Sequence, residues 1–210
     1  LTDLLDQGTL DPAKRARVVK ALSGFDGASV RETLGRHLED PDPRVVDEAA
    51  LGLARAREGV AVTYLLAILR RVEDPLRPRA REALEDLTSF TLPVTSYEAL
   101  ADQYEAWFRT HRQGGDRTWF RDAVGRKGYD TTSLGGYARG EDDVKAVPLL
   151  LRTIRDDDPV IRRNSDVALR RVSRREMPTR IERGTSREEA RAVADRWAAW
   201  WARRPEAQGK

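Results

Sequence analysis

The sequence contains no cysteine and only two histidines among its 210 residues. Without cysteine the chain cannot form disulfides, a thiolate nucleophile or a sulfur-ligated metal site, and its redox compartment cannot be read from the sequence. His37 and His111 stand alone, with no His-Glu pair and no His-x-x-x-His spacing. Serines such as Ser133 and Ser165 lack a nucleophile-elbow motif. We therefore expect no metal, no cofactor and no enzymatic activity.

Long apolar runs are also missing. The best stretch, Val60 to Leu69, is interrupted by Thr63 and followed by two arginines. It is too short to span a bilayer, which takes about 20 apolar residues. We therefore expect a soluble protein. Its 40% hydrophobic residues suffice to bury a sizeable core. The chain begins at Leu1 and not at Met, so a cytoplasmic location and export after removal of an N-terminal segment both stay open.

Lysine is scarce, since 33 of the 38 basic residues are arginine. The charges are also unevenly distributed along the chain. Residues 1–106 carry 14 basic and 19 acidic side chains, whereas residues 107–210 carry 24 basic and 16 acidic ones. The N-terminal half is therefore acidic and the C-terminal half basic, which suggests an extended ligand of asymmetric charge or an acidic protein segment as the partner.

An internal repeat organises the chain. Its pattern is Asp-Pro, then an arginine, a small residue and an Ala-Leu pair. Strict copies begin at Asp11 and Asp158, and looser copies begin at Asp42 and Asp74. An aspartate N-cap followed by proline at the first helical position marks a helix start. The small residues share one face of the predicted helix and allow a neighbouring helix to approach closely.

A second amphipathic segment precedes three of these predicted helices. The apolar positions are Val30, Leu34 and Leu38; Val62, Leu65, Leu66 and Leu69; and Val147, Leu150, Leu151 and Ile154. Each repeat is thus a helical hairpin, too short to bury its own apolar face, so neighbouring hairpins must stack into a solenoid.

The Asp-Pro and Arg positions resemble those of HEAT repeats, particularly the short bacterial kind related to phycobilisome-lyase repeats. This resemblance implies an all-α, right-handed α-solenoid that acts as a non-enzymatic protein-binding scaffold of unknown oligomeric state. The spacing of 31 residues between Leu22, Leu53 and Leu84 is below the roughly 40 to 47 residues usual for HEAT units.

A second duplication appends tryptophan-rich helices to the repeats. Residues 101–111 recur as residues 194–204, so that Trp107 corresponds to Trp200. The aromatic stripe favours burial against the preceding repeat, although exposed tryptophans would be anchors for a partner. The Gly-rich stretch Gly125 to Gly140 is interpreted as a loop. The predicted organisation is repeats 1–3 over 1–88, a connector with a Trp-rich helix over 89–140, a further repeat over 141–175, and a second connector and Trp-rich helix over 176–210.

The candidate partner-binding residues lie on and after the last Asp-Pro helix. They are Arg162, Arg163, Arg170, Arg171, Arg174 and Arg175. Second helices of stacked repeats usually line the concave face, so these arginines are expected to flank the basic end of a groove that binds a protein, such as an acidic segment. A purely structural or solvated role is the competing interpretation, since Asp166 stands four residues from both Arg162 and Arg170.

Nucleic-acid binding through this Arg-rich half is the alternative function. Two enzymatic relatives carry less weight, namely HEAT-like alkylpurine DNA glycosylases and bilin lyases. No motif in the sequence marks a catalytic aspartate or a bilin site, so only an analogy of fold connects the chain to them.

Overall fold

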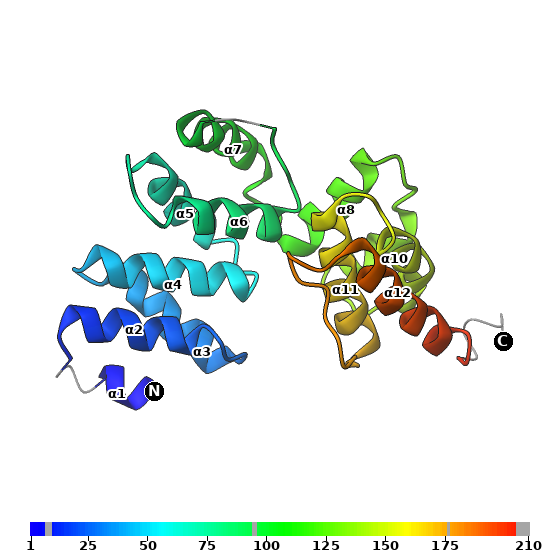
Figure 1. The fold of residues 1–210 in the computed structure, drawn as a ribbon, viewed down its shortest axis with the longest axis horizontal. Helices are drawn as coiled ribbons and strands as arrows, with labels where there is room; N and C mark the ends of the chain where they lie inside the picture. The colour runs from blue at the N-terminus through cyan, green and yellow to red at the C-terminus, as the bar shows by residue number, and fades with distance from the viewer. Residues whose placement is uncertain (7–9, 94–95, 176, 205–210) are drawn as a thin grey trace. The chain divides into compact units, whose positions relative to one another are not determined.

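The computed structural model describes residues 1–6, 10–93, 96–175 and 177–204. Every regular element in these ranges is helical, which confirms the all-α fold of packed helix pairs (Figure 1). The chain divides into two units, Leu1–Asp116 and Arg117–Lys210. The boundary falls inside the segment 89–140 that we interpreted as a connector. Within the described residues, no helix is long and apolar enough to cross a membrane.

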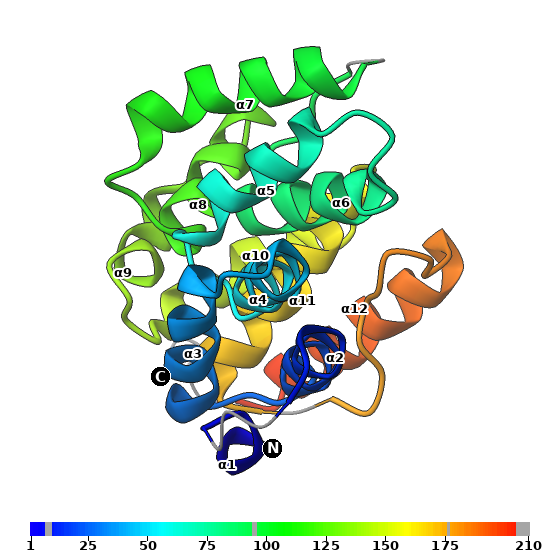
Figure 2. The ribbon, with the colours of Figure 1, turned by 90° about the vertical axis from the view of Figure 1, so that its left-hand side faces the viewer.

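The first unit is built from two layers of helices. Its elements are α1 Thr2–Asp6, α2 Pro12–Leu22, α3 Ala28–Arg36, a 3₁₀ turn His37–Glu39, α4 Pro43–Arg55, α5 Ala61–Arg70, α6 Arg77–Thr88 and α7 Tyr97–His111. The Asp-Pro helices α2, α4 and α6 pack on one another in sequence. In the other layer α7 lies along α5, where the first helix of a further hairpin would lie (Figure 2).

The Asp-Pro motif starts helices as predicted at three of its four copies. Asp11, Asp42 and Asp158 are N-caps whose carboxylates accept a backbone N–H of the first turn. The copy at Asp74 is different, because α6 begins only at Arg77. There the Asp74 carboxylate accepts the Leu76 amide at 2.8 Å in the turn before the helix. The shorter spacing after this proline therefore moves the helix start by two residues.

In the copy that begins at Asp42, Gly52 of α4 takes the place of the alanine of the Ala-Leu pair, on the face predicted to allow close approach of a neighbouring helix. A Cβ added to Gly52 would lie 2.8 Å from Ser23 Cβ, just after α2, and 3.0 Å from a methyl carbon of Leu34 in α3. Such distances are below ordinary van der Waals contact, so neither neighbour leaves room for a side chain. Glycine is thus required at this point of the stack.

The second unit contains one complete hairpin and several short elements. Its elements are α8 Asp116–Arg126, 3₁₀ turns Thr132–Leu134 and Val144–Ala146, α9 Gly135–Ala138, α10 Val147–Thr153, α11 Pro159–Ser173 and α12 Arg187–Trp201. The prediction of a loop over Gly125 to Gly140 is wrong in part, because Gly125 lies within α8 and residues 135–138 form helix α9. Burial explains the difference, since Leu134 and Tyr137 belong to the core and fix these turns.

The second duplication is visible in three dimensions. Helix α12 packs on α10 as α7 packs on α5, and the corresponding residues Tyr104 and Trp197 are both fully buried. Trp200 is buried as well. Its counterpart Trp107 is only partly buried and stacks between Phe90 and His111. The prediction of two equivalent, largely buried tryptophans is therefore confirmed for Trp200 but not fully for Trp107.

Candidate partner-binding surface

The arginine of the repeat motif has a structural role at both strict copies. The Arg15 guanidinium donates to the Leu10 carbonyl at 3.0 Å, just before α2. Arg162 donates at 2.8 Å to the carbonyls of Asp156 and Asp157, just before α11. Arg162 is 9% exposed. We therefore remove it from the candidate surface, because its side chain closes the turn that leads into its own helix.

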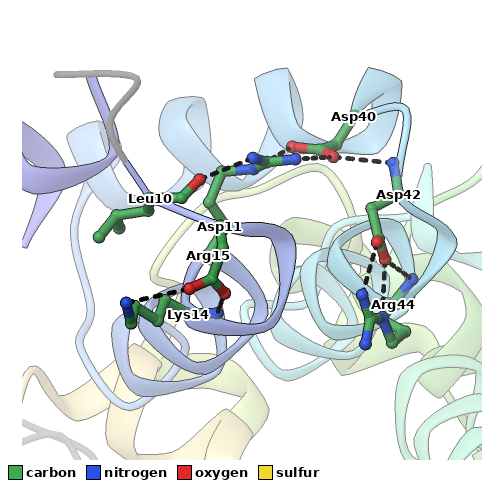
Figure 3. Close-up of polar contacts among 7 residues, drawn as sticks. All are labelled: Leu10, Asp11, Lys14, Arg15, Asp40, Asp42 and Arg44. Carbon is green, nitrogen blue, oxygen red and sulfur yellow. Dashed lines mark hydrogen bonds and ion pairs between the residues drawn. The ribbon is translucent and has the colours of Figure 1, made fainter.

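The first unit shows how this arginine also joins neighbouring repeats (Figure 3). Arg15 forms two parallel hydrogen bonds with the Asp40 carboxylate, at 3.1 and 3.0 Å. Asp40 in turn accepts the Asp42 amide at 2.9 Å. Burial alone would raise the pKa of Asp40, but the hydrogen bonds from Arg15 and from the Asp42 amide hold it below its usual value.

Asp42 carries the more strongly shifted pKa of this cluster. Its carboxylate caps α4 and binds the Arg44 guanidinium at 3.0 and 2.8 Å. The hydrogen bond from the Arg44 side chain is the main cause that lowers the pKa of Asp42 to about 2. The cluster in Figure 3 is a joint between repeats, whose charged groups form hydrogen bonds and ion pairs with one another.

Arg170 is buried in a second polar cluster, inside the second unit. It donates to Asp166 at 3.0 Å, and to the carbonyls of Met177 and Thr179 at 3.1 and 2.8 Å. Asp166 also accepts the Ile181 amide at 3.2 Å. The predicted bridge from Asp166 to Arg170 is therefore confirmed, whereas Arg162 uses its guanidinium elsewhere.

The same carboxylate reaches the Trp-rich helix. Trp197 Nε1 donates to Asp166 Oδ1 at 2.8 Å. Asp166 is 1% exposed, so one buried carboxylate ties α11 to α12 and to the segment between them. Arg170 serves this cluster and is unavailable to a partner. Arg163, at 6% exposed, is likewise buried, and both are corrections to the predicted set.

Three of the six predicted arginines remain accessible. Arg171 is partly exposed, while Arg174 and Arg175 are exposed. We call these three residues the arginine end of α11. Arg174 adopts a left-handed conformation, with φ of 50°, that stops the helix. Its side chain is 82% exposed and approaches Asp142 at 3.1 Å.

Aromatic and basic groups surround the arginine end of α11. The Arg171 guanidinium lies 3.5 Å from the Tyr137 hydroxyl, and Arg117 lies over the Tyr137 ring at 4.9 Å from its centroid. Arg117 also lies 3.6 Å from Asp142. An exposed pair such as Arg174 and Asp142 contributes little to stability, about 0 to 1 kcal/mol, so it can open for a competing carboxylate.

Next to the arginine end of α11 lies a small pocket, which the sequence analysis did not predict. Its volume is about 100 Å³. The lining residues are Val144, Val172, Ser173, Trp200, Trp201 and Arg204. The Arg204 guanidinium lies 5.0 Å from the Trp200 ring centroid. The sequence signal that could have indicated this pocket is the Trp-rich stripe, because its alternative interpretation places exposed tryptophans in contact with a partner.

The histidines are bound to their own helices. His37 Nδ1 lies 2.8 Å from the Thr33 carbonyl, and His111 Nδ1 lies 2.8 Å from the Trp107 carbonyl. Among the residues that the structure describes, no group of three or more His, Cys, Asp or Glu side chains is placed to hold a metal ion.

Residues 1–85 match the family model of HEAT repeats. The HEAT match covers α1 to α5 and ends inside α6. The resemblance predicted from the Asp-Pro motif is therefore confirmed for this segment. No curated protein and no solved structure matches the chain.

Proposed function

We propose that the chain is a non-enzymatic scaffold that binds another protein. The match to HEAT repeats over residues 1–85 carries this proposal, since stacked helical repeats present extended surfaces that are used for binding. The repeat-to-repeat joint at Arg15 and Asp40 supports it, because such joints hold successive helices in fixed register. The finer likeness to short bacterial phycobilisome-lyase-type repeats belongs to the same proposal.

The partner we propose is an acidic protein segment that binds at the arginine end of α11. Arg174 and Arg175 are exposed, and the contact between Arg174 and Asp142 is the kind of surface pair that a new carboxylate can replace. Arginine is also enriched among the residues that dominate binding energy at interfaces. Charge complementarity would then set the orientation of the bound segment.

The test is affinity capture from extracts of the source cells, followed by titration of the captured protein. Replacing Arg174 and Arg175 by glutamate should weaken binding of that protein by at least about tenfold, since charged hydrogen bonds contribute about 1.5 to 3 kcal/mol each. Arg191→Glu with Arg196→Glu is the matched control, because both residues are exposed on α12 of the same unit. Equal affinity of the two double variants would contradict the assignment of the surface.

Nucleic-acid binding is an outcome that the same experiment separates. A duplex and a single-stranded oligonucleotide would be titrated at low and high salt beside the protein partner. Binding to phosphates weakens steeply with salt, because counterions are released. An oligonucleotide that binds more tightly than any captured protein, with a steep salt slope, would replace the scaffold proposal by the nucleic-acid alternative.

A further inference from the structure

The pocket beside the arginine end of α11 offers hydrogen-bond donors and no carboxylate. Val144, Val172 and the rings of Trp200 and Trp201 give it apolar walls. The lining residues with polar side-chain groups are Arg204, the two tryptophans with their indole N–H groups, and Ser173, whose hydroxyl donates to the Arg170 carbonyl at 3.4 Å. Since no acidic side chain lines it, the pocket is complementary to an apolar group that carries a negative charge beside it.

One donor at the pocket is left without a partner. Trp200 is 7% exposed, and its indole Nε1 is buried with no hydrogen-bond acceptor within reach among the residues that the structure describes. A buried donor without an acceptor costs about 1 to 3 kcal/mol. Trp197, on the same helix, donates its Nε1–H to Asp166. Because the Trp200 nitrogen is covered in the structure, a ligand oxygen would accept the N–H only after a neighbouring side chain shifts, and would then remove the cost.

Arg204 is the second group that points to a ligand. Its guanidinium lies over the Trp200 ring, and no described carboxylate pairs with it. By contrast, Arg155 and Arg187 of the same unit bind Asp195 and Asp157. The pocket thus combines an uncompensated cation with an unsatisfied N–H on one aromatic residue.

The volume limits what can occupy the site. A pocket of about 100 Å³ holds roughly three waters at about 30 Å³ each, whereas pockets for drug-sized ligands and cofactors measure about 300 to 1,000 Å³. One branched aliphatic side chain fits this space. The charged group must then lie at the mouth, next to Arg204 and to Arg174, which follows Ser173 in the chain.

We propose that this pocket binds a single leucine or valine side chain of an acidic partner segment, with a flanking carboxylate bound by Arg204. The inference rests on the proposed scaffold function and names the anchor residue of its partner. Residues that dominate binding energy fill well-packed pockets from which the surrounding contacts exclude water, and arginine is frequent among them. The arginine end of α11 would bind the neighbouring acidic residues of the same segment.

The experiment uses the full chain and a fluorescently labelled pentapeptide, in which one leucine is flanked on each side by two glutamates and the C-terminus is amidated. We expect saturable binding by fluorescence anisotropy. Replacing the leucine by alanine, or the glutamates by glutamine, should each weaken binding by about tenfold or more. No saturation with the parent peptide at millimolar concentration overturns the inference.

Variants of the chain locate the binding. Arg204→Ala should weaken the peptide about tenfold or more, and Arg203→Ala, the adjacent exposed arginine that does not line the pocket, should leave it unchanged. Val144→Phe fills the pocket from a residue that is 36% exposed, so the fold should persist while the peptide is excluded. Val72→Phe, at a residue 76% exposed in the first unit, is its control.

Trp200→Phe separates binding from structure. It keeps an aromatic ring and removes only the second ring with the unpartnered N–H, so circular dichroism should be unchanged while the peptide binds more weakly. Peptide affinity equal to the parent in both Trp200→Phe and Arg204→Ala would overturn the inference. Self-association in light scattering that Val144→Phe abolishes would also overturn it, because the occupant would then be a second copy of the chain.

The outcome for the scaffold proposal is read separately. The Arg174→Glu, Arg175→Glu variant could lose the captured partner while Val144→Phe and Arg204→Ala retain it. This result would support the scaffold function and would refute the pocket as the site that binds the partner's leucine or valine. Loss in all these variants, with the controls intact, supports both.

Discussion

Removing the Asp166 carboxylate should destabilise the second unit more than any surface change. Asp166→Ala leaves the Arg170 guanidinium buried without its charge partner and takes the acceptor from Trp197 Nε1 and from the Ile181 amide. Breaking a buried ion pair by deleting one member costs about 3 to 5 kcal/mol. Three donors depend on this one carboxylate, so we expect the upper part of that range.

The matched control is Asp195→Ala on α12. Asp195 binds Arg155 at 2.7 Å, but its side chain is 72% exposed. Exposed pairs contribute about 0 to 1 kcal/mol. The same chemical change should therefore cost several times less than Asp166→Ala, although both aspartates bind an arginine in the same unit.

Urea unfolding followed by tryptophan fluorescence measures the difference. Trp119, Trp197, Trp200 and Trp201 belong to the second unit and Trp107 belongs to the first, so the signal reports mainly on the second unit. In thermal melts a loss of about 4 to 5 kcal/mol corresponds to a decrease in Tm of about 16 to 40 °C, at about 4 to 8 °C per kcal/mol for a unit of this size.

A further variant tests the cause. Replacing Asp166 by leucine and Arg170 by methionine together removes both charges, and should recover part of the stability lost in Asp166→Ala. The reasoning is refuted if Asp166→Ala loses less than about 1 kcal/mol, as expected for the surface control.

Three other predictions concern the first unit. Gly52→Ala should lower the free energy of unfolding by about 1 to 3 kcal/mol through overpacking. Gly35→Ala, with no atom within 4 Å of the added Cβ, should raise it by about 0.5 to 1 kcal/mol because alanine has the higher helix propensity. Urea midpoints of the two variants that shift in the same direction would contradict this. The folded-state pKa of Asp42 is lowered from 3.8 to about 2, so the contribution of its charge to stability is present above about pH 4 and is lost as the pH falls toward about 2. Asp42→Asn still caps α4 and should therefore flatten the pH dependence of the urea midpoint between about pH 4 and about pH 2. Burial raises the pKa of Asp47, although its ion pair with Arg71 acts in the opposite direction. The stability of the first unit should therefore fall as the pH rises above 3.8 and Asp47 ionises. Asp47→Asn should leave the urea midpoint at pH 7 unchanged or higher, and a clear drop would show that the charge of Asp47 is needed.

The helices could be predicted from the sequence because their signals are local. Asp-Pro at residues 11, 42 and 158 fixes both the N-cap and the first helical turn, and these helices begin where the motif places them. Apolar spacing likewise identified α5 and α10. The later start of α6 goes with the shorter spacing after its proline, whereas the helical turns within the Gly-rich stretch depend on burial of Leu134 and Tyr137 against side chains distant in sequence, which no local pattern contains.

The candidate surface was harder to predict, for a physical reason. Arg162 and Arg174 look alike in sequence, but the first lies in the opening turn of α11, facing its own preceding carbonyls, and the second lies just past the end of the helix. Buried guanidiniums need several hydrogen-bond acceptors. Backbone carbonyls can supply them, and no residue type in the sequence marks such an acceptor. The pocket was missed because its walls come from three separate segments.

The ends of the two connectors lead to a different consequence. Helices α6 and α11 both stop at a left-handed residue, Ser89 and Arg174, and α7 and α12 both start after a serine N-cap, Ser96 and Ser186. The chain between these fixed points is longer in the second copy, yet α12 contacts α10 as α7 contacts α5. Connectors of different length and sequence thus lead to corresponding helices. In the second connector Met177, Thr179 and Ile181 bind the cluster of Arg170 and Asp166, so the exposed residues 182–184 beyond them are the suitable position for grafting a new recognition loop onto this fold.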